Sequence, residues 1–267
     1  MNRIITGLIV GAVWLLLLFR GNFVLFWLTI IVLAALALHE YCSMMVPSKG
    51  KQFSIVGIAA GLLPPIAAYT GQPSAVAAGL FMSLLVLLAF TLYRYGSLEQ
   101  PIDFLIRLIF GAAYVGVCSA HLTLIMARQQ GALWLLVLTA ITVASDTGAY
   151  YCGSFFGKTK LCPAISPGKT VEGFIGGLFC GVAAALAVAF YFFPGFNVLK
   201  MTVIAIILAC FGVMGDLTES VIKRSAGVKD SGTLLPGHGG VLDRIDSVLI
   251  TAPILFYLLH FNFFSGA

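Results

Sequence analysis

Long apolar stretches alternate with short polar breaks along the chain, and this alternation predicts a bundle of membrane helices. Most stretches approach or exceed the ~18 residues that a helix needs to cross a bilayer. Nine are recognisable, at roughly 4–19, 23–45, 53–70, 75–93, 102–126, 132–153, 171–193, 199–222 and 244–262. Turn-forming residues fill several breaks, such as Pro-Ser-Lys-Gly at 47–50 and Gly-Gln-Pro-Ser at 71–74. The pattern predicts an all-α, polytopic integral membrane protein with about nine transmembrane helices.

Composition agrees with this interpretation. The chain is 60% hydrophobic and only 9% charged, whereas soluble domains average about 25% charged residues. The first apolar stretch follows Arg3 but precedes no small-residue cleavage site, so we expect a membrane helix rather than a signal peptide. No internal repeat or soluble domain is visible. We expect a single membrane domain over 1–267, with N-terminal helices at 1–130 and catalytic helices and loops at 131–267.

The distribution of basic residues predicts the orientation, because Lys and Arg are retained on the cytoplasmic side of inserted helices. With nine spans, the N-terminus and the even-numbered loops share one side. That side carries eleven of the fifteen basic residues: Arg3, Lys49, Lys51, Arg94, Lys158, Lys160, Lys169, Lys223, Arg224, Lys229 and Arg244. We therefore expect a multi-pass protein of the cell (inner, cytoplasmic) membrane, with its charged loops facing the cytoplasm. The net charge of +5 reflects this face and gives no case for nucleic-acid binding.

The first polar segment that suggests chemistry begins at Ser145-Asp146 and continues into Ser166-Pro167-Gly168-Lys169-Thr170. The Gly-Lys-Thr sequence is not a P-loop, because that motif requires glycine where this chain has Pro163, and no strand precedes it. A Gly-Lys-Thr turn that opens a helix can still hold phosphate oxygens with backbone N–H groups and an ammonium.

The second polar segment runs from Asp216 to Asp246 and holds nine of the 25 charged residues. A helical spacing places Asp216, Glu219, Ser220 and Lys223 on one face of the eighth span. The same spacing places Asp243, Asp246 and Ser247 on one face at the start of the ninth span. Carboxylates presented by two helices are ligands that Mg²⁺ prefers, with substrate phosphate and water completing the shell. We expect a Mg²⁺ site where the carboxylates of these two helices face one another.

Some of these charges have a simpler explanation as solvated loop residues, especially Arg224 and Lys229. That explanation suits Asp216 poorly, because a carboxylate inside an apolar span costs roughly 2.5–3.5 kcal/mol on insertion scales. Four glycines surround His238, at positions 232, 237, 239 and 240, and suggest a loop that cradles phosphate. His238 itself could bind phosphate or only fix the loop.

These motifs resemble the phosphatidate cytidylyltransferase (CDP-diglyceride synthase) family. The resemblance rests on Ser220-x-x-Lys223-Arg224, Lys229-Asp230-x-Gly232, Leu235-Pro236-Gly237-His238-Gly239-Gly240 and Asp243-Arg244-Ile245-Asp246, with Ser145-Asp146 and Ser166 to Gly173 as earlier elements. It implies the reaction of CTP with phosphatidate to give CDP-diacylglycerol and pyrophosphate. It also implies Mg²⁺ and a second cation such as K⁺, a lipid-bilayer setting and a homodimer.

The resemblance further implies roles for individual residues. The expected catalytic residues are Asp216, Lys223, Asp230, Asp243 and Asp246, of which Asp216 and Asp243 hold the metal. The expected substrate-binding residues are Asp146, Lys169, Ser220, Arg224, Lys229, His238, Gly239, Gly240 and Arg244. Two alternatives stay open: a CTP-dependent lipid kinase, which would transfer the γ-phosphoryl group, and a secondary transporter. The transporter fits less well, because the charges gather at one face and no repeat is visible.

Overall fold

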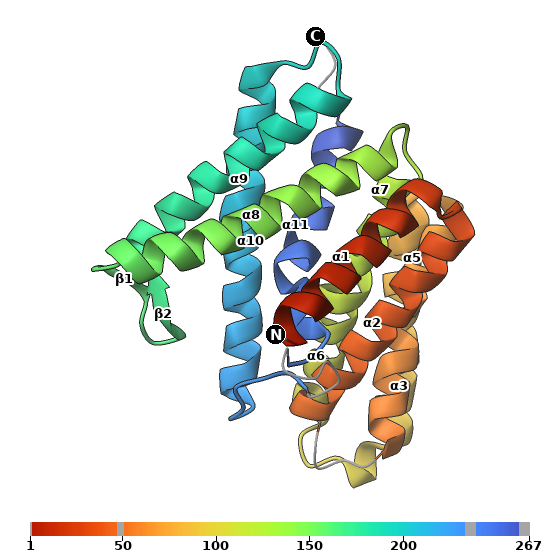
Figure 1. The fold of residues 1–267 in the computed structure, drawn as a ribbon. Helices are drawn as coiled ribbons and strands as arrows, with labels where there is room; N and C mark the ends of the chain where they lie inside the picture. The colour runs from red at the N-terminus through yellow and green to blue at the C-terminus, as the bar shows by residue number, and fades with distance from the viewer. Residues whose placement is uncertain (1, 47–50, 233–238, 262–267) are drawn as a thin grey trace. The chain divides into compact units, whose positions relative to one another are not determined.

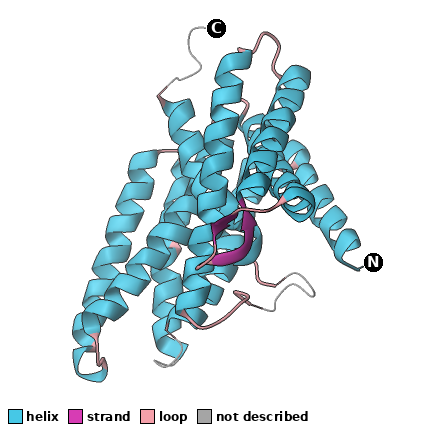
Figure 2. Ribbon diagram, turned by 90° about the vertical axis from the view of Figure 1, so that its left-hand side faces the viewer, coloured by secondary structure: helices cyan, strands magenta, loops and turns pink. Residues whose placement is uncertain are grey.

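The computed structural model describes residues 2–46, 51–232 and 239–261. These residues are almost entirely helical, with one small antiparallel sheet (Figure 2). They form two compact units, one made of residues 1–129 and 226–244, the other of residues 130–225 and 245–267. The segment 226–244, which carries much of the second polar segment, therefore belongs with the N-terminal helices rather than with the helices that flank it in sequence.

The N-terminal unit contains α1 to α7 and the short helices between them. Their bounds are α1 Asn2–Arg20, α2 Phe23–Met45, α3 Lys51–Gly61, α4 Leu63–Ala67, η1 Ala68–Thr70, α5 Pro73–Tyr93, η2 Tyr95–Ser97, α6 Pro101–Gly111, the π-helical turn η3 Ala112–Val117, and α7 Cys118–Met126. Two predicted spans are thus subdivided. The span at 53–70 breaks before Pro64 and Pro65, since proline lacks the N–H that continues a helix.

Close helix crossings in this unit depend on glycine. A Cβ added at Gly116 would collide with the carbonyl oxygen of Gly61, and one added at Gly111 would lie 2.5 Å from the ring of Tyr41. Tyr41 in turn donates a hydrogen bond to the carbonyl oxygen of Arg107 at 2.8 Å. These contacts join α2, α3, α6 and η3, so that α2 is buried along one face.

The second unit contains α8 Gly131–Phe156, β1 Lys160–Cys162, β2 Ser166–Thr170, α9 Val171–Phe192, α10 Val198–Ser225 and most of α11 Leu242–His260. Helices α8 and α9 lie side by side over most of their length (Figure 1). Added Cβ atoms at Gly173 and Gly177 would lie 2.7 and 2.8 Å from carbonyl oxygens of α8, so small residues permit this close approach.

Seven helical segments are long and apolar enough to cross a membrane within the described part of the chain. They are 23–45, 52–70, 73–93, 101–126, 131–156, 171–192 and 198–225. The prediction of an all-α polytopic membrane protein is confirmed. The short hairpin of β1 and β2 adds only a little β-structure. The number nine stays a prediction, because α1 yields only a shorter apolar helix and α11 is not among the seven.

Candidate active site

Lys169 and Asp216 form an ion pair in the second unit. The Nζ of Lys169 lies 2.6 Å from Oδ2 of Asp216, and both side chains are only partly exposed. Asp216 also receives a long hydrogen bond of 3.5 Å from the hydroxyl of Ser220, one helical turn later. Two residues predicted for different ligands, phosphate and metal, are thus direct partners.

A short hairpin brings Lys169 to this position. Gly168 and Lys169 lie in β2, which pairs with β1 in the register Lys160 to Thr170, so the predicted turn at these residues is wrong. The chain becomes helical only after Thr170, whose hydroxyl caps α9 by accepting from the N–H of Gly173 at 3.1 Å. Lys169 therefore lies in a strand between the paired residues Ser166 and Thr170, and its ammonium reaches Asp216 on α10.

The first turn of α9 is occupied by the protein itself. The N–H of Val171 donates to the carbonyl oxygen of Thr159, while the Glu172 carboxylate accepts from the N–H groups of Lys158 and Thr159 at 3.0 and 3.1 Å. These bonds hold the hairpin against α9. Any phosphate bound here would therefore meet the Lys169 ammonium rather than these amides.

Asp246 lies within electrostatic range of the Lys169–Asp216 pair. Asp246, at the start of α11, experiences the charges of Asp216, Asp146 and Lys169. Gly215 permits the approach of α10 to α11, because an added Cβ would lie 2.5 Å from the carbonyl oxygen of Asp246. Carboxylate oxygens are the ligands that Mg²⁺ prefers.

A ready-made cluster of three or more metal-ligating side chains does not occur among the described residues. Mg²⁺ does not require one, because it is usually bound by one or two carboxylates with substrate phosphate and water. The approach of the Asp216 and Asp246 carboxylates to one another is therefore the observation that fits this ion.

The expected helical face on α10 is present. Lys223 Nζ lies 2.5 Å from Glu219 Oε2, and the two residues are one helical turn apart. Ser220 and Asp216 are separated by the same number of residues. Glu219 is buried, with its side chain only 1% exposed, although no role was predicted for it. This pair extends the polar face from Asp216 towards the end of α10.

In the N-terminal unit, Asp243 holds the glycine-containing segment together. Its Oδ2 accepts from the N–H of Ser231 at 3.0 Å, from the hydroxyl of Ser231 at 2.9 Å and from the N–H of Gly240 at 2.7 Å. Gly239 has φ of 78°, and an added Cβ there would lie 2.6 Å from this oxygen. The amide of Gly240, predicted to cradle phosphate, thus binds a carboxylate of the protein.

Sequence reasoning missed Glu40. This residue is 3% exposed within α2, and its carboxylate accepts hydrogen bonds from the N–H groups of Val241 and Leu242. It also lies 3.1 Å from the Ser231 hydroxyl, whose one proton it shares with Asp243. The sequence did contain an indication of this role, because a carboxylate in an apolar span is costly and usually has a specific partner. Its partners lie about two hundred residues away in sequence, which no local pattern reveals.

The other predicted residues are more exposed or lie elsewhere. Arg224, Lys229, Asp230 and Arg244 are exposed, as expected of charges at helix ends and loops. His238 and Gly237 lie outside the described residues.

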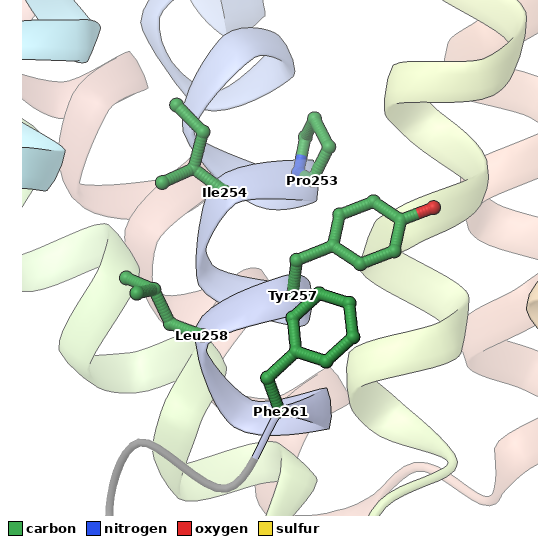
Figure 3. Close-up of a pocket in the computed structure, with 5 residues that line it drawn as sticks. All are labelled: Pro253, Ile254, Tyr257, Leu258 and Phe261. Atoms are coloured by element: carbon green, nitrogen blue, oxygen red, sulfur yellow. The ribbon is translucent and has the colours of Figure 1, made fainter.

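A separate pocket on the C-terminal half of α11 has an apolar lining of Pro253, Ile254, Tyr257, Leu258 and Phe261 (Figure 3). Only the Tyr257 hydroxyl is polar in this set. The lining offers no charge for phosphate and suits hydrocarbon instead.

Comparison with known proteins gives a consistent answer. Residues 1–262 match the model of the cytidylyltransferase family. The chain is 38% identical over 263 residues to the phosphatidate cytidylyltransferase of Staphylococcus aureus (strain COL), covering 96% of this chain and 98% of the relative. The protein of the same name from Staphylococcus saprophyticus is 37% identical over 262 residues, with the same coverage. The chain belongs to the cytidylyltransferase family.

Proposed function

We propose that this chain transfers the cytidylyl group of CTP to phosphatidate, which gives CDP-diacylglycerol and pyrophosphate. The observation that best supports this activity is the Lys169–Asp216 pair, whose charges act on Asp246 together with that of Asp146. An ammonium beside carboxylates can bind a nucleotide phosphate together with a cation. The names of the relatives supply the base and the lipid.

The reaction needs no side-chain nucleophile. A phosphate oxygen of phosphatidate attacks the α-phosphorus of CTP, and the bond from that phosphorus to the oxygen that bridges to the β-phosphorus breaks. The electron pair leaves with pyrophosphate. Catalysis of such a displacement consists mainly of positioning and charge stabilisation.

The chain contributes cations and orientation. We assign Lys169 to the CTP phosphates, because the hairpin fixes its backbone and its ammonium already faces a polar cluster. Lys223, Arg224, Lys229 and Arg244 are assigned to triphosphate and lipid phosphate, where the planar guanidinium groups suit bidentate contact. Ser220 supports Asp216 through their hydrogen bond.

We assign Mg²⁺ first to Asp216, with Asp146 and Asp246 beside it. When bound, the ion neutralises charge on the phosphate oxygens and on the leaving pyrophosphate. Asp243 remains a proposed ligand, and Asp230 a proposed site residue on the exposed part of the loop. A second cation such as K⁺ and a homodimer are proposed from the family resemblance alone. We also propose that the site faces the cytoplasm, from the basic loops.

Isotope transfer tests the reaction. Purified protein in phosphatidate-containing vesicles is given CTP labelled at either the α- or the γ-phosphate, with Asp216→Asn as the matched inactive control. The α-label should enter lipid and the γ-label should leave as pyrophosphate. Entry of the γ-label into lipid would identify a lipid kinase instead, and transfer of neither label would remove the proposed activity.

A further inference from the structure

We propose that Glu40 is a positioning residue of the active site, which holds the segment 226–244 in place from α2. The catalytic consequence of this role rests on the proposed function. The contacts that support the role all lie within the N-terminal unit. Glu40 lies in an apolar span, far in sequence from every motif described above. Its partners all lie in the segment that carries Lys229, Asp230 and Asp243.

The contacts of Glu40 reach two described parts of this segment, 226–232 and 239–244. Oε1 accepts from the N–H of Val241 at 2.9 Å, and Oε2 accepts from the N–H of Leu242 at 2.8 Å. These amides lie at the start of α11, where backbone donors have no helical acceptor and a negative charge is favourable. Oε2 also lies 3.1 Å from the hydroxyl of Ser231, in the part of the segment before residue 233.

Ser231 transmits this anchoring to Asp243. Its hydroxyl lies between Glu40 Oε2 and Asp243 Oδ2, at 3.1 and 2.9 Å, and its own N–H donates to Asp243. Glu40 therefore fixes the backbone that fixes Asp243, without any requirement to touch substrate. Loss of such supporting contacts typically costs about 10- to 100-fold in affinity or activity at metal sites.

Two glycines of the segment are explained by the same carboxylate. A Cβ added at Gly232 would lie 2.7 Å from Glu40 Oε1 and 3.0 Å from Cδ. A Cβ added at Gly240 would collide with the hydroxyl of Ser231 and approach Glu40 Oε2. The Glu40 carboxylate cannot move aside without breaking its hydrogen bonds, so these glycines make room for a protein anion.

The chemistry of the anchor makes glutamine a poor substitute. Each carboxylate oxygen accepts from a backbone N–H, so either orientation of an amide would place its NH₂ against a backbone donor. Aspartate keeps both acceptors but shortens the reach. We therefore expect Glu40→Ala and Glu40→Gln to be similarly harmful, and Glu40→Asp to retain part of the function.

Amide hydrogen exchange and turnover together test the proposal. In purified protein, Glu40→Ala and Glu40→Gln should each speed exchange of the Val241 and Leu242 amides by at least about 10-fold and lower kcat by about 10- to 100-fold. His39→Gln, at the exposed neighbouring position on α2, should change neither. Unchanged exchange at these two amides in both Glu40 variants would overturn the proposal.

A double mutant keeps the test decisive if a single variant folds poorly. Gly232→Ala should speed exchange in the wild-type background but add less than about twofold to Glu40→Ala, because the group it strikes is then absent. An equal effect in both backgrounds would contradict the anchor. A wild-type protein without cytidylyl transfer would remove the proposed function, while the exchange data would still decide the role of Glu40.

Discussion

The ammonium of Lys169 lies 2.6 Å from the carboxylate of Asp216, although one residue belongs to a hairpin strand and the other to an apolar helix 47 positions later. The pair neutralises charge that would otherwise be costly between apolar helices. A nucleotide phosphate that binds the Lys169 ammonium and a metal ion that binds the Asp216 carboxylate would therefore share this ion pair or compete with it. Lys169 and Asp216 should therefore act together.

Removal of Lys169 should weaken nucleotide binding. Lys169→Ala loses a charged phosphate contact, which corresponds to an increase of about 10- to 100-fold in the KM for CTP. Lys160→Ala, at an exposed position of the same hairpin, is the matched control and should leave KM unchanged. Equal KM values in wild type and Lys169→Ala would return Lys169 to a purely structural role.

Removal of Asp216 should affect the metal requirement. Asp216→Asn keeps the shape of the side chain but loses its charge, so we expect kcat to fall by about 100-fold or more and the remaining activity to need more Mg²⁺. Asp246→Asn should give the same signature, and the double variant should be little worse than either single one. Fully multiplicative losses would show that the two carboxylates act independently.

Two substitutions at Asp243 should separate its functions. Asparagine can place its carbonyl oxygen where Oδ2 accepts from Ser231 and Gly240, whereas alanine cannot. Asp243→Asn should keep slow amide exchange at Gly240 but lose most activity, and Asp243→Ala should lose both. If asparagine retained near-wild-type turnover, Asp243 would be an anchor of the loop rather than a metal ligand.

Removal of one partner from the ion pair of Glu219 and Lys223 should destabilise the protein far more than the same change in an exposed pair of equal spacing, because it leaves a buried charge without its partner. The side chains of the buried pair are 1% and 14% exposed, against 48% and 44% for Asp103 and Arg107. Breaking a buried pair by removal of one partner costs about 3–5 kcal/mol, and an exposed pair contributes about 0.2–1 kcal/mol. Thermal unfolding in detergent should therefore show a much lower midpoint for Glu219→Gln than for Asp103→Asn.

Orientation is best tested at an exposed position. Ser231 is buried and hydrogen-bonded, so a cysteine there would be shielded on either side of the membrane. Val228→Cys is exposed and should escape an impermeant thiol reagent added to intact cells, whereas Pro194→Cys should react. The six native cysteines provide the background, measured in wild type. Rapid labelling of Val228→Cys in intact cells would reverse the predicted orientation.

Local features of this protein followed from its sequence. Apolar length predicted the membrane helices, and α2 begins and ends where the pattern indicated, at Phe23 and Met45. The spacing of Glu219 and Lys223 predicted their shared helical face, because residues four apart are always neighbours on a helix. Motif spacing led to the family, which the comparisons confirmed. All of these depend on residues near one another in the chain.

Long-range partners were decided only by the tertiary structure. The hairpin that carries Lys169 to Asp216, and the path that brings Glu40 to Val241 and Leu242, depend on how distant segments pack. Sequence alone did not single out Glu40, and no local pattern could have named its donors. It interpreted Gly240 as a phosphate cradle, whereas packing places a protein carboxylate there. A glycine in the sequence indicates that a larger side chain would not fit at that position. Only the tertiary structure shows which neighbouring group occupies the space.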